Sequence, residues 1–316
     1  MRTRRAALAA ALAAGLALPL AARADFPEKP IEVLVPAGPG SATDTVTRLV
    51  VNMVAEQKSL SQPLVVVNVT GGGPLAANRT RDATPDGHTI MVYHVGLIGL
   101  ATVGKLPFGV EAFAPLAQTG STRFLLVAAS DGPYADAKAL VEAAKANPGG
   151  ISEANSIGGA SHIATLLFAK EAGFKVRVVH VGDGPKRLQS VLGGHSAYTV
   201  VSPPEYDGFQ GTGIKALAVL GQERNPKYPD VPSTKELGWN VDFSVDTWWF
   251  APKDTPAEVT AELSGAIAKA MADQGLKDGL SAGGVDPVIL TGEPLAQRIA
   301  TVDAAVKPLA DALQGQ

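Results

Sequence analysis

The chain has 316 residues, with 27 basic and 30 acidic side chains, so its net charge at neutral pH is −3. A weakly acidic chain is not typical of a protein that binds nucleic acid or anionic membranes. It has no cysteine, which excludes disulfides, thiolate metal sites and cysteine nucleophiles. Its length is sufficient for about two domains.

The first 24 residues have the pattern of a secretory signal. Arginines cluster in residues 1–5, an apolar run occupies residues 6–20, and Ala22-Arg23-Ala24 has the small residues of a cleavage site. We expect cleavage after Ala24 and a periplasmic mature protein without direct membrane insertion. Loss of four arginines leaves 23 basic against 30 acidic residues, a net charge of −7. The Arg4-Arg5 pair leaves twin-arginine export open as an alternative.

After the leader, strand and helix patterns alternate. The β-rich run Ile31–Val35 predicts a strand, and Ser41-Ala42-Thr43-Asp44 has the form of a capping box. Apolar residues from Val46 to Val54 recur at helical spacing and predict a helix with one buried stripe. The next predicted elements are a strand at Leu64–Val67, a helix to about Ala83 and a strand at Thr89–Val92.

The alternation continues to the C-terminal part of the chain. It returns at Phe124–Ala128, Leu140–Ala146, Ile163–Leu167, Val176–Val179, Leu188–Leu192, Tyr198–Val201 and Ala216–Leu220. Thr255 as N-cap, with Pro256 and Glu258 in the first turn, predicts a helix over residues 256–275. Such alternation predicts parallel sheets covered by helices on both faces.

Glycine-rich turns separate several predicted strands from the helices that follow. They lie at residues 38–41, 71–73, 156–161 and 182–185. Each presents backbone N–H groups at the positive end of a helix, where anions bind, although glycine also serves tight turns in general. None has the sequence of a P-loop or of the dinucleotide fingerprint. Tyr93 and His94 end a predicted strand, where ligands meet open α/β sheets.

One short motif points to catalysis. Residues 279–283 match the G-x-S-x-G elbow of α/β hydrolases, which needs a strand before the serine and a helix after it. Here the motif follows a helical segment and indicates a helix C-terminus. The five histidines have no metal-binding spacing, so we expect no metal. We also expect no cofactor. Trp248 and Trp249 are expected in the core.

Motifs along nearly the whole mature chain resemble those of the Bug family, the periplasmic solute receptors of tripartite tricarboxylate transporters. The matching segments are Pro30–Asp44, Pro85–Thr89, Ala143–Gly149, Gly158–His162, Leu192–Gly194, Lys215–Val219, Pro229–Ser233 and Ala251–Pro256. Single matches are weak, but so many in the same order are specific.

The resemblance implies a periplasmic-binding-protein (Venus-flytrap) fold, in which a cleft separates two α/β domains. Residues 25–123 and 245–316 are expected to form domain 1, and residues 124–244 domain 2. It implies a non-enzymatic, monomeric receptor that captures a small carboxylate and delivers it to integral-membrane transporter subunits.

The expected ligand-binding residues lie in the glycine turns and at strand ends. They are Gly38, Pro39, Gly40, Ser41, Ala42, Thr43, Asp44, Thr70, Gly71, Gly72, Gly73, Tyr93, His94, Gly158, Gly159, Ala160, Ser161, His180, Gly182, Asp183, Gly184 and Ser202.

The chain departs from the family pattern near one turn. His180 replaces an aromatic hydroxyl and Asp183 replaces a glycine, which adds a negative charge close to the expected anion. If Asp183 points into the cleft, the ligand should carry an amino, amide or hydroxyl donor; if it points out, a plain dicarboxylate is expected. A ligand-binding receptor for a membrane sensor, and a secreted hydrolase using Ser281, stay open as alternative functions.

Overall fold

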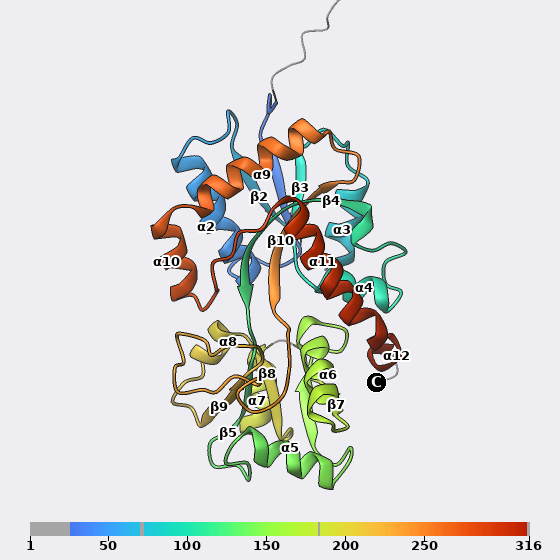
Figure 1. Cartoon of the computed structure of the whole chain (residues 1–316), viewed down its shortest axis with the longest axis vertical. Coiled ribbons are helices and arrows are strands. Elements are labelled where there is room, and N and C mark those ends of the chain that lie inside the picture. Colours follow the sequence, from blue (N-terminus) through green and yellow to red (C-terminus); the bar gives the residue numbers. More distant parts are fainter. Residues whose placement is uncertain (1–25, 70–72, 183, 315–316) are drawn as a thin grey trace, which may run out of the picture.

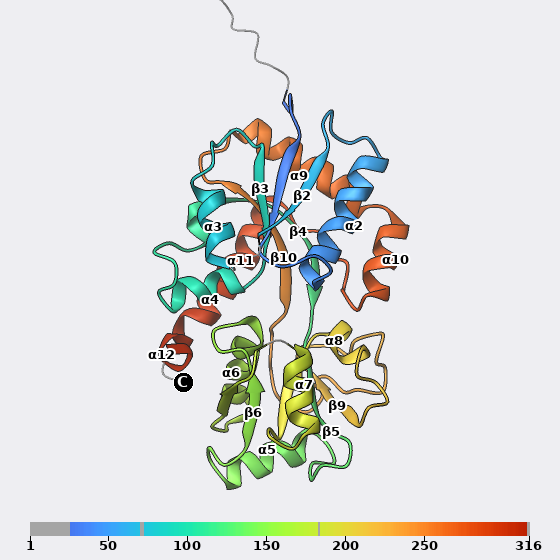
Figure 2. The same ribbon diagram turned by 180° about the vertical axis from the view of Figure 1, so that it is seen from behind.

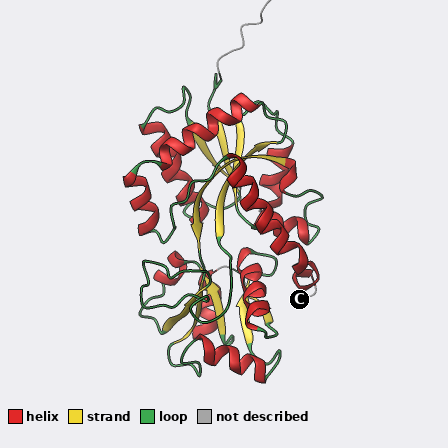
Figure 3. Cartoon of the chain, in the orientation of Figure 1, coloured by secondary structure: helices red, strands yellow, loops and turns green. Residues whose placement is uncertain are grey.

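The computed structural model describes residues 26–69, 73–182 and 184–314, which form two α/β domains placed end to end (Figure 1). Each domain contains one five-stranded sheet with helices on both faces (Figure 3). Within these ranges, no helix combines the length and the apolar character needed to cross a membrane.

The first sheet has the strand order β2-β1-β3-β10-β4. Its strands are β1 (Ile31–Val35), β2 (Leu64–Asn68), β3 (Thr89–Tyr93), β4 (Phe113–Thr122) and β10 (Val245–Pro252). The helices around it are α2 (Ala42–Glu56), α3 (Gly73–Arg81), α4 (Gly96–Thr102), α9 (Ala257–Met271), α10 (Gln274–Ala282) and α11 (Gly292–Val306), with the short turn η1 (Val110–Ala112) before β4.

The second sheet has the order β7-β6-β8-β5-β9. Its strands are β5 (Leu125–Ala129), β6 (Ser152–Asn155), β7 (Arg177–His180), β8 (Tyr198–Val201) and β9 (Ile214–Val219). Its helices are α5 (Ala137–Ala146), α6 (Ala160–Ala172), α7 (Gly184–Leu192) and α8 (Pro203–Asp207). The chain ends in η2 (Lys307–Leu309) and α12 (Ala310–Gln314), which lies beside α6 of the second domain in both views (Figures 1 and 2).

The sheets are mixed, so the prediction of purely parallel sheets is wrong. Strand β10 runs antiparallel to β3 and β4, and β5 runs antiparallel to β8 and β9. These two strands are those that enter a sheet from the other domain. They begin at the interdomain end, whereas β1, β3, β6 and β8 finish there, and so their direction must be opposite.

Strand β10 shows how the first sheet divides its core. Trp249 packs toward α2 and α9, whereas Trp248 and Phe250 pack toward α3, α4 and α11. Both tryptophans are fully buried, as predicted, and their indole N–H groups donate to Gln118 and Thr119 on β4 at 3.2 and 2.9 Å. The alternation follows from the period of two in a strand.

The start of α9 differs from the prediction. Pro256 is the N-cap residue, and the Thr255 hydroxyl donates to the carbonyl oxygen of Pro252 at 2.8 Å instead of capping the helix. The predicted helix over 256–275 is two helices, because Asp273 caps a new one by accepting from the Leu276 N–H. An aspartate at this position favours a fresh helix start over continuation.

A buried carboxylate fixes the strands where they cross between the domains. Asp246, at the start of β10, is fully buried and accepts hydrogen bonds from Ser121, Ser244 and the Nε of Arg298. Arg123, between β4 and β5, pairs with Asp286. A buried charge is tolerated when it is paired and hydrogen-bonded, and this network joins β4, β10 and α11.

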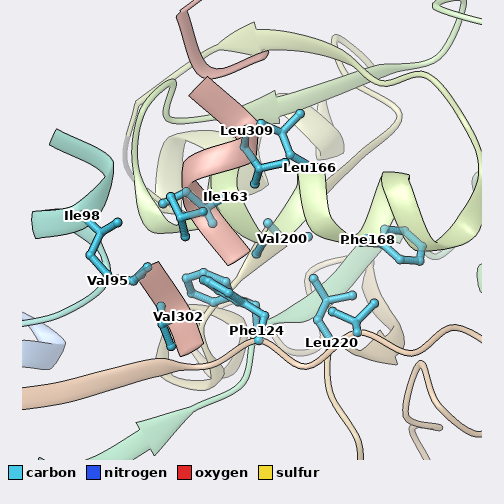
Figure 4. Packing of buried hydrophobic residues seen from close by; sticks show 14 of the residues in the cluster. Val95, Ile98, Phe124, Ile163, Leu166, Phe168, Val200, Leu220, Val302 and Leu309 are labelled. Atoms are coloured by element: carbon cyan, nitrogen blue, oxygen red, sulfur yellow. The ribbon is translucent and has the colours of Figure 1, made fainter. Parts of the chain in front are cut away.

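The two domains also share apolar packing on one side of the crossing strands. Ile98 of α4, Val302 of α11 and Leu309 of η2 belong to the same buried cluster as Ile163 and Leu166 of α6 (Figure 4). The clustered side chains therefore come from both domains, and the C-terminal segment α11–α12 is a third connection beside the two crossings of the chain.

Gly99 sets the approach of α4 to α6. A Cβ atom there would lie 3.2 Å from both the carbonyl oxygen of Gly158 and the Cδ1 of Ile163. We predict that Gly99→Val pushes α4 and α6 apart, lowers ligand affinity roughly tenfold and leaves each domain folded. Calorimetric titration would measure the affinity, and small-angle scattering would measure the separation of the domains. Ala101→Val on the same helix serves as the control. Gly104→Val is not used as a control, because Gly104 has φ +73° and a valine there would strain the backbone.

Candidate ligand-binding site

A cavity of about 270 Å³ lies where the two domains meet. Most of its lining comes from helix N-termini and from strand ends at the crossing. The lining residues are Ala42, Thr43, Val46, Tyr93, His94, Thr122, Phe124, Ser156, Gly159, Ala160, Ser161, Arg187, Ser202, Glu205, Val245, Thr247 and Val285. It is thus formed by both sheets at the edge where most of their strands end.

The first wall contains the N-terminus of α2. Ser41 is the N-cap residue and its Oγ accepts from the Asp44 N–H at 3.2 Å. Ala42 and Thr43, the first two helical residues, have no helical partner for their N–H groups, and no described residue accepts from them. Two backbone donors at the positive end of a helix are therefore available to the cavity.

Asp44 lies behind this turn and not in the cavity lining. It is 2% exposed, and it accepts from the Gly40 N–H and from Asn68 Nδ2, both at 2.8 Å, and from Arg48. Burial alone would raise its pKa, but the bonds from Arg48, Gly40 and Asn68 together hold that pKa below its usual value. The carboxylate fixes the turn that positions Ala42 and Thr43.

The opposite wall contains the N-terminus of α6. The turn before it is fixed by two histidines, because the N–H groups of Gly158 and Ile157 donate to Nδ1 of His162 and His180 at 3.1 and 3.2 Å. The N–H groups of Ala160 and Ser161 have no acceptor among the described residues. Two helix N-termini, one from each domain, thus line the same cavity.

At the end of β3, His94 adds a side-chain donor. Burial lowers its pKa to about 4, so the imidazole is neutral at pH 7. Its Nδ1 accepts from the Gly96 N–H at 3.0 Å, and the ring proton therefore resides on Nε2. A neutral N–H donor can bind a carboxylate without adding charge to the cavity.

Ser202, Glu205 and Arg187 line the second-domain side near α8. Glu205 Oε2 accepts from the Ser202 N–H and hydroxyl at 2.8 and 2.9 Å. Arg187 donates to the carbonyl oxygens of Gly182 and Val200, and its Nη2 lies 3.7 Å from Glu205 Oε2. Within the described lining, these are the two charged side chains, and their charges cancel.

Comparisons with known proteins agree with this geometry. A family model described as "Tripartite tricarboxylate transporter family receptor" matches residues 46–314. The chain belongs to this family. It is a solute-binding protein of a family that works in the periplasm, and the family and its fold are those of receptors that are not enzymes.

Three similar proteins cover nearly the whole receptor. BugT of Bordetella pertussis is 30% identical over 288 residues, which span 88% of this chain and 87% of BugT. A TctC solute-binding protein from Polaromonas has 27% identity and a TM-score of 0.75, covering 91% and 99% of the two chains. MatC from Rhodopseudomonas palustris with bound malate has 27% identity and a TM-score of 0.74, covering 90% and 100%.

The structure brings eight of the predicted ligand-binding residues into the cavity lining of this receptor. They are Ala42, Thr43, Tyr93, His94, Gly159, Ala160, Ser161 and Ser202. Thr70, Gly71, Gly72 and Asp183 lie outside the described residues. Ligand contact by any of these residues stays a prediction.

The other predicted residues lie outside the cavity lining. They are Gly38, Pro39, Gly40, Ser41 and Asp44 before or in α2, Gly73 at the start of α3, Gly158 before α6, and His180, Gly182 and Gly184 around α7. Gly40 has φ +78°, and a Cβ atom placed on it would meet no other atom within 4 Å. The positive φ by itself accounts for a glycine at this position.

Nine lining residues were absent from the prediction: Val46, Thr122, Phe124, Ser156, Arg187, Glu205, Val245, Thr247 and Val285. Thr122, Phe124 and Val245 lie where the chain crosses between the sheets, next to the domain boundaries expected at residues 123/124 and 244/245. Those expected boundaries were a signal that could have indicated them. Ser156 follows β6 directly, as His94 follows β3. Glu205 carried no such signal.

Ser281 lies in the last turn of α10, which Gly283 ends as C-cap residue. The residues before the serine are helical, whereas the nucleophile elbow needs a strand there. The interpretation of residues 279–283 as a helix end therefore agrees with the structure.

Gly184 leaves room for Glu205. A Cβ atom at position 184 would lie 2.0 Å from Glu205 Oε1. We predict that Gly184→Ala moves the Glu205 side chain away from Ser202, changes ligand selectivity and shifts the melting temperature by only a few degrees, because the end of a glutamate side chain can move. Titration and a melting curve would check this, with Gly193→Ala at the far end of α7 as control. Unchanged selectivity in the Gly184 variant would contradict it.

Proposed function

We propose that this receptor captures a small organic acid in the interdomain cavity and delivers it to the membrane subunits of a tripartite tricarboxylate-type transporter. The observation that carries the proposal is the meeting of two helix N-termini, where the N–H groups of Ala42, Thr43, Ala160 and Ser161 lack acceptors among the described residues. Such groups bind anions.

The charge balance of the cavity also favours a carboxylate that must be released again. Arg187 and Glu205 cancel, and His94 is neutral at pH 7. Backbone dipoles at helix N-termini can hold an anion without a full opposite charge. The bound malate of MatC, a similar receptor, supports an organic acid of comparable size.

A ligand screen tests the proposal directly. Mono-, di- and tricarboxylates and their amides are compared by thermal shift and then by calorimetric titration. A ligand at 100 times its Kd should stabilise the protein by about 2.7 kcal/mol. At least one carboxylate should do so and its amide should not. A screen in which amides match their acids would contradict an anion site.

Delivery to a transporter needs a test in cells. Deletion of the gene should abolish uptake of the labelled acid identified in the screen, and the chain supplied from a plasmid should restore it. Loss of a transcriptional response with unchanged uptake would favour the alternative, a receptor for a membrane sensor.

We propose further that the exported protein is cleaved after Ala24 and is a monomer. Intact mass and light scattering of periplasmic material test both points.

We propose residues 25–123 and 245–316 as domain 1 and residues 124–244 as domain 2. Expression of residues 124–244 alone should give a folded, cooperatively melting domain; a molten product would contradict these limits.

A further inference from the structure

The hydroxyl groups of Ser161 and Ser202 are oriented by their own domain. Both serines line the cavity and both are at least nine-tenths buried, with exposures of 4% and 9%. What each can offer a ligand depends on where its proton points, because a hydroxyl has one donor and two acceptor lone pairs. The surrounding hydrogen bonds settle this direction.

Ser161 gives its proton to Asn155. The Ser156 N–H lies 2.7 Å from Asn155 Oδ1, and a backbone N–H can only donate, which identifies that atom as the oxygen. Ser161 Oγ lies 2.6 Å from the same oxygen and must donate to it. Toward the cavity, Ser161 Oγ therefore has only lone pairs.

Deeper side chains hold the Asn155 amide in this orientation. Asn155 Nδ2 donates to Glu153 Oε1 at 2.8 Å and to Thr165 Oγ1 at 3.2 Å, and Asn155, Glu153 and Thr165 are all fully buried. Thr165 also donates to Glu153. Reversal of the amide would lose several of these bonds at once, at a cost typical of buried polar groups.

The Ser202 hydroxyl also donates its proton to a side chain of the second domain. Its hydroxyl donates to Glu205 Oε2, which also accepts from the Ser202 N–H. Ser202 Oγ accepts from the backbone N–H of Glu205 in the capping box of α8, which leaves it one lone pair for a ligand. Glu205, a further member of the lining, is itself an acceptor. The side chains of Ser161, Ser202 and Glu205 need a donor from the ligand.

The charge around Glu205 decides the kind of donor. Arg187 Nη2 lies 3.7 Å from Glu205 Oε2, so among the described lining residues a positive and a negative charge adjoin at that end of the cavity. An ammonium group there would meet both the guanidinium and the carboxylate, so it would lose its hydration without a full opposite charge to offset the loss, whereas a hydroxyl donates without that cost.

We propose that the second domain selects ligands that carry an uncharged hydroxyl donor, through Ser161 and Ser202, with Asn155 and Glu205 as positioning residues. This inference rests on the proposed capture of an organic acid. It assigns the hydroxyl group to the second domain and leaves the carboxylate to the helix N-termini.

Matched acids test the inference. Succinate, malate and aspartate differ only in hydrogen, hydroxyl or ammonium on one carbon, and glutarate with its 2-hydroxy and 2-amino forms gives a longer series. The hydroxy acid should bind at least about tenfold more tightly than both relatives in the series that fits. Ser161→Ala and Ser202→Ala should each lower this ratio, and the double variant should bring it close to one.

Two further variants separate this role from general damage. Ser202→Thr keeps a hydroxyl and should keep the preference. Ser190→Ala, which removes a bond to Ser196 outside the cavity lining, should leave all affinities unchanged. Equal binding of the unsubstituted acid, tighter binding of the amino acid, or a preference that survives in the double variant would overturn the inference while leaving organic-acid capture intact. If no acid in any series binds, the proposed function fails, and the inference fails with it.

Discussion

Ala42→Glu is expected to abolish carboxylate binding without weakening the fold. Ala42 is the first residue of α2, it is exposed, and it lines the cavity. A glutamate there places a negative charge and extra volume against the expected anion, so affinity should fall at least about 100-fold. The same charge at a helix N-terminus stabilises the helix by about 0.3–1 kcal/mol. Calorimetric titration and thermal melting measure the two effects separately.

Thr45→Glu is the matched control for this change. Thr45 is exposed in the first turns of the same helix but is not part of the cavity lining. The control variant should gain similar stability from the helix dipole and keep its ligand affinity. If both variants lose affinity equally, a long-range field of negative charge is responsible, and the site does not include the α2 N-terminus.

Glu153→Gln is expected to change how stability depends on pH. Glu153 is fully buried on β6, and burial raises its pKa from 4.5 to about 8, despite hydrogen bonds from Thr165 and Asn155 and the charge of Arg187. Between these values the folded state binds a proton that the unfolded state has lost. Stability of the natural protein therefore contains a term that falls as the pH rises from about 4.5 to about 8.

The Glu153→Gln variant lacks this pH-dependent contribution to the free energy of unfolding. Its free energy of unfolding, relative to the natural protein, should rise between pH 5 and pH 8 by up to a few kcal/mol. Urea unfolding at several pH values measures the difference. Glu142→Gln on α5 is the control, since its side chain is 73% exposed. A constant difference for Glu153→Gln would mean that Glu153 is ionised in the folded protein.

The sequence predicts most of the elements because their patterns are local. The stripe from Val46 to Val54 and the apolar run of β1 specify α2 and a buried strand without reference to the rest of the fold. Strand direction is not local. Strands β5 and β10 each follow a crossing from the other domain, and this crossing determines their direction. The alternation of strand and helix patterns does not show where the chain crosses.

The candidate site also contains some residues that local sequence patterns predict and others that depend on the tertiary structure. Ala42 and Ala160 could be predicted because a glycine turn before a helix has a recognisable composition. Glu205 could not, because its role depends on the Arg187 side chain 3.7 Å away and on the space that Gly184 leaves. A polar residue on a short helix has no sequence pattern that distinguishes a cavity wall from the surface.

The cancelling charges of Arg187 and Glu205 have a consequence for the rate of capture. A cavity whose described lining has no net side-chain charge, in a mildly acidic protein, exerts little attraction on an anion in solution, so arrival is governed by diffusion and orientation. Ionic strength acts mainly on long-range attraction between exposed charges. The association rate should therefore be nearly the same in dilute and in saline media, and differences between ligands should arise in how long each stays bound.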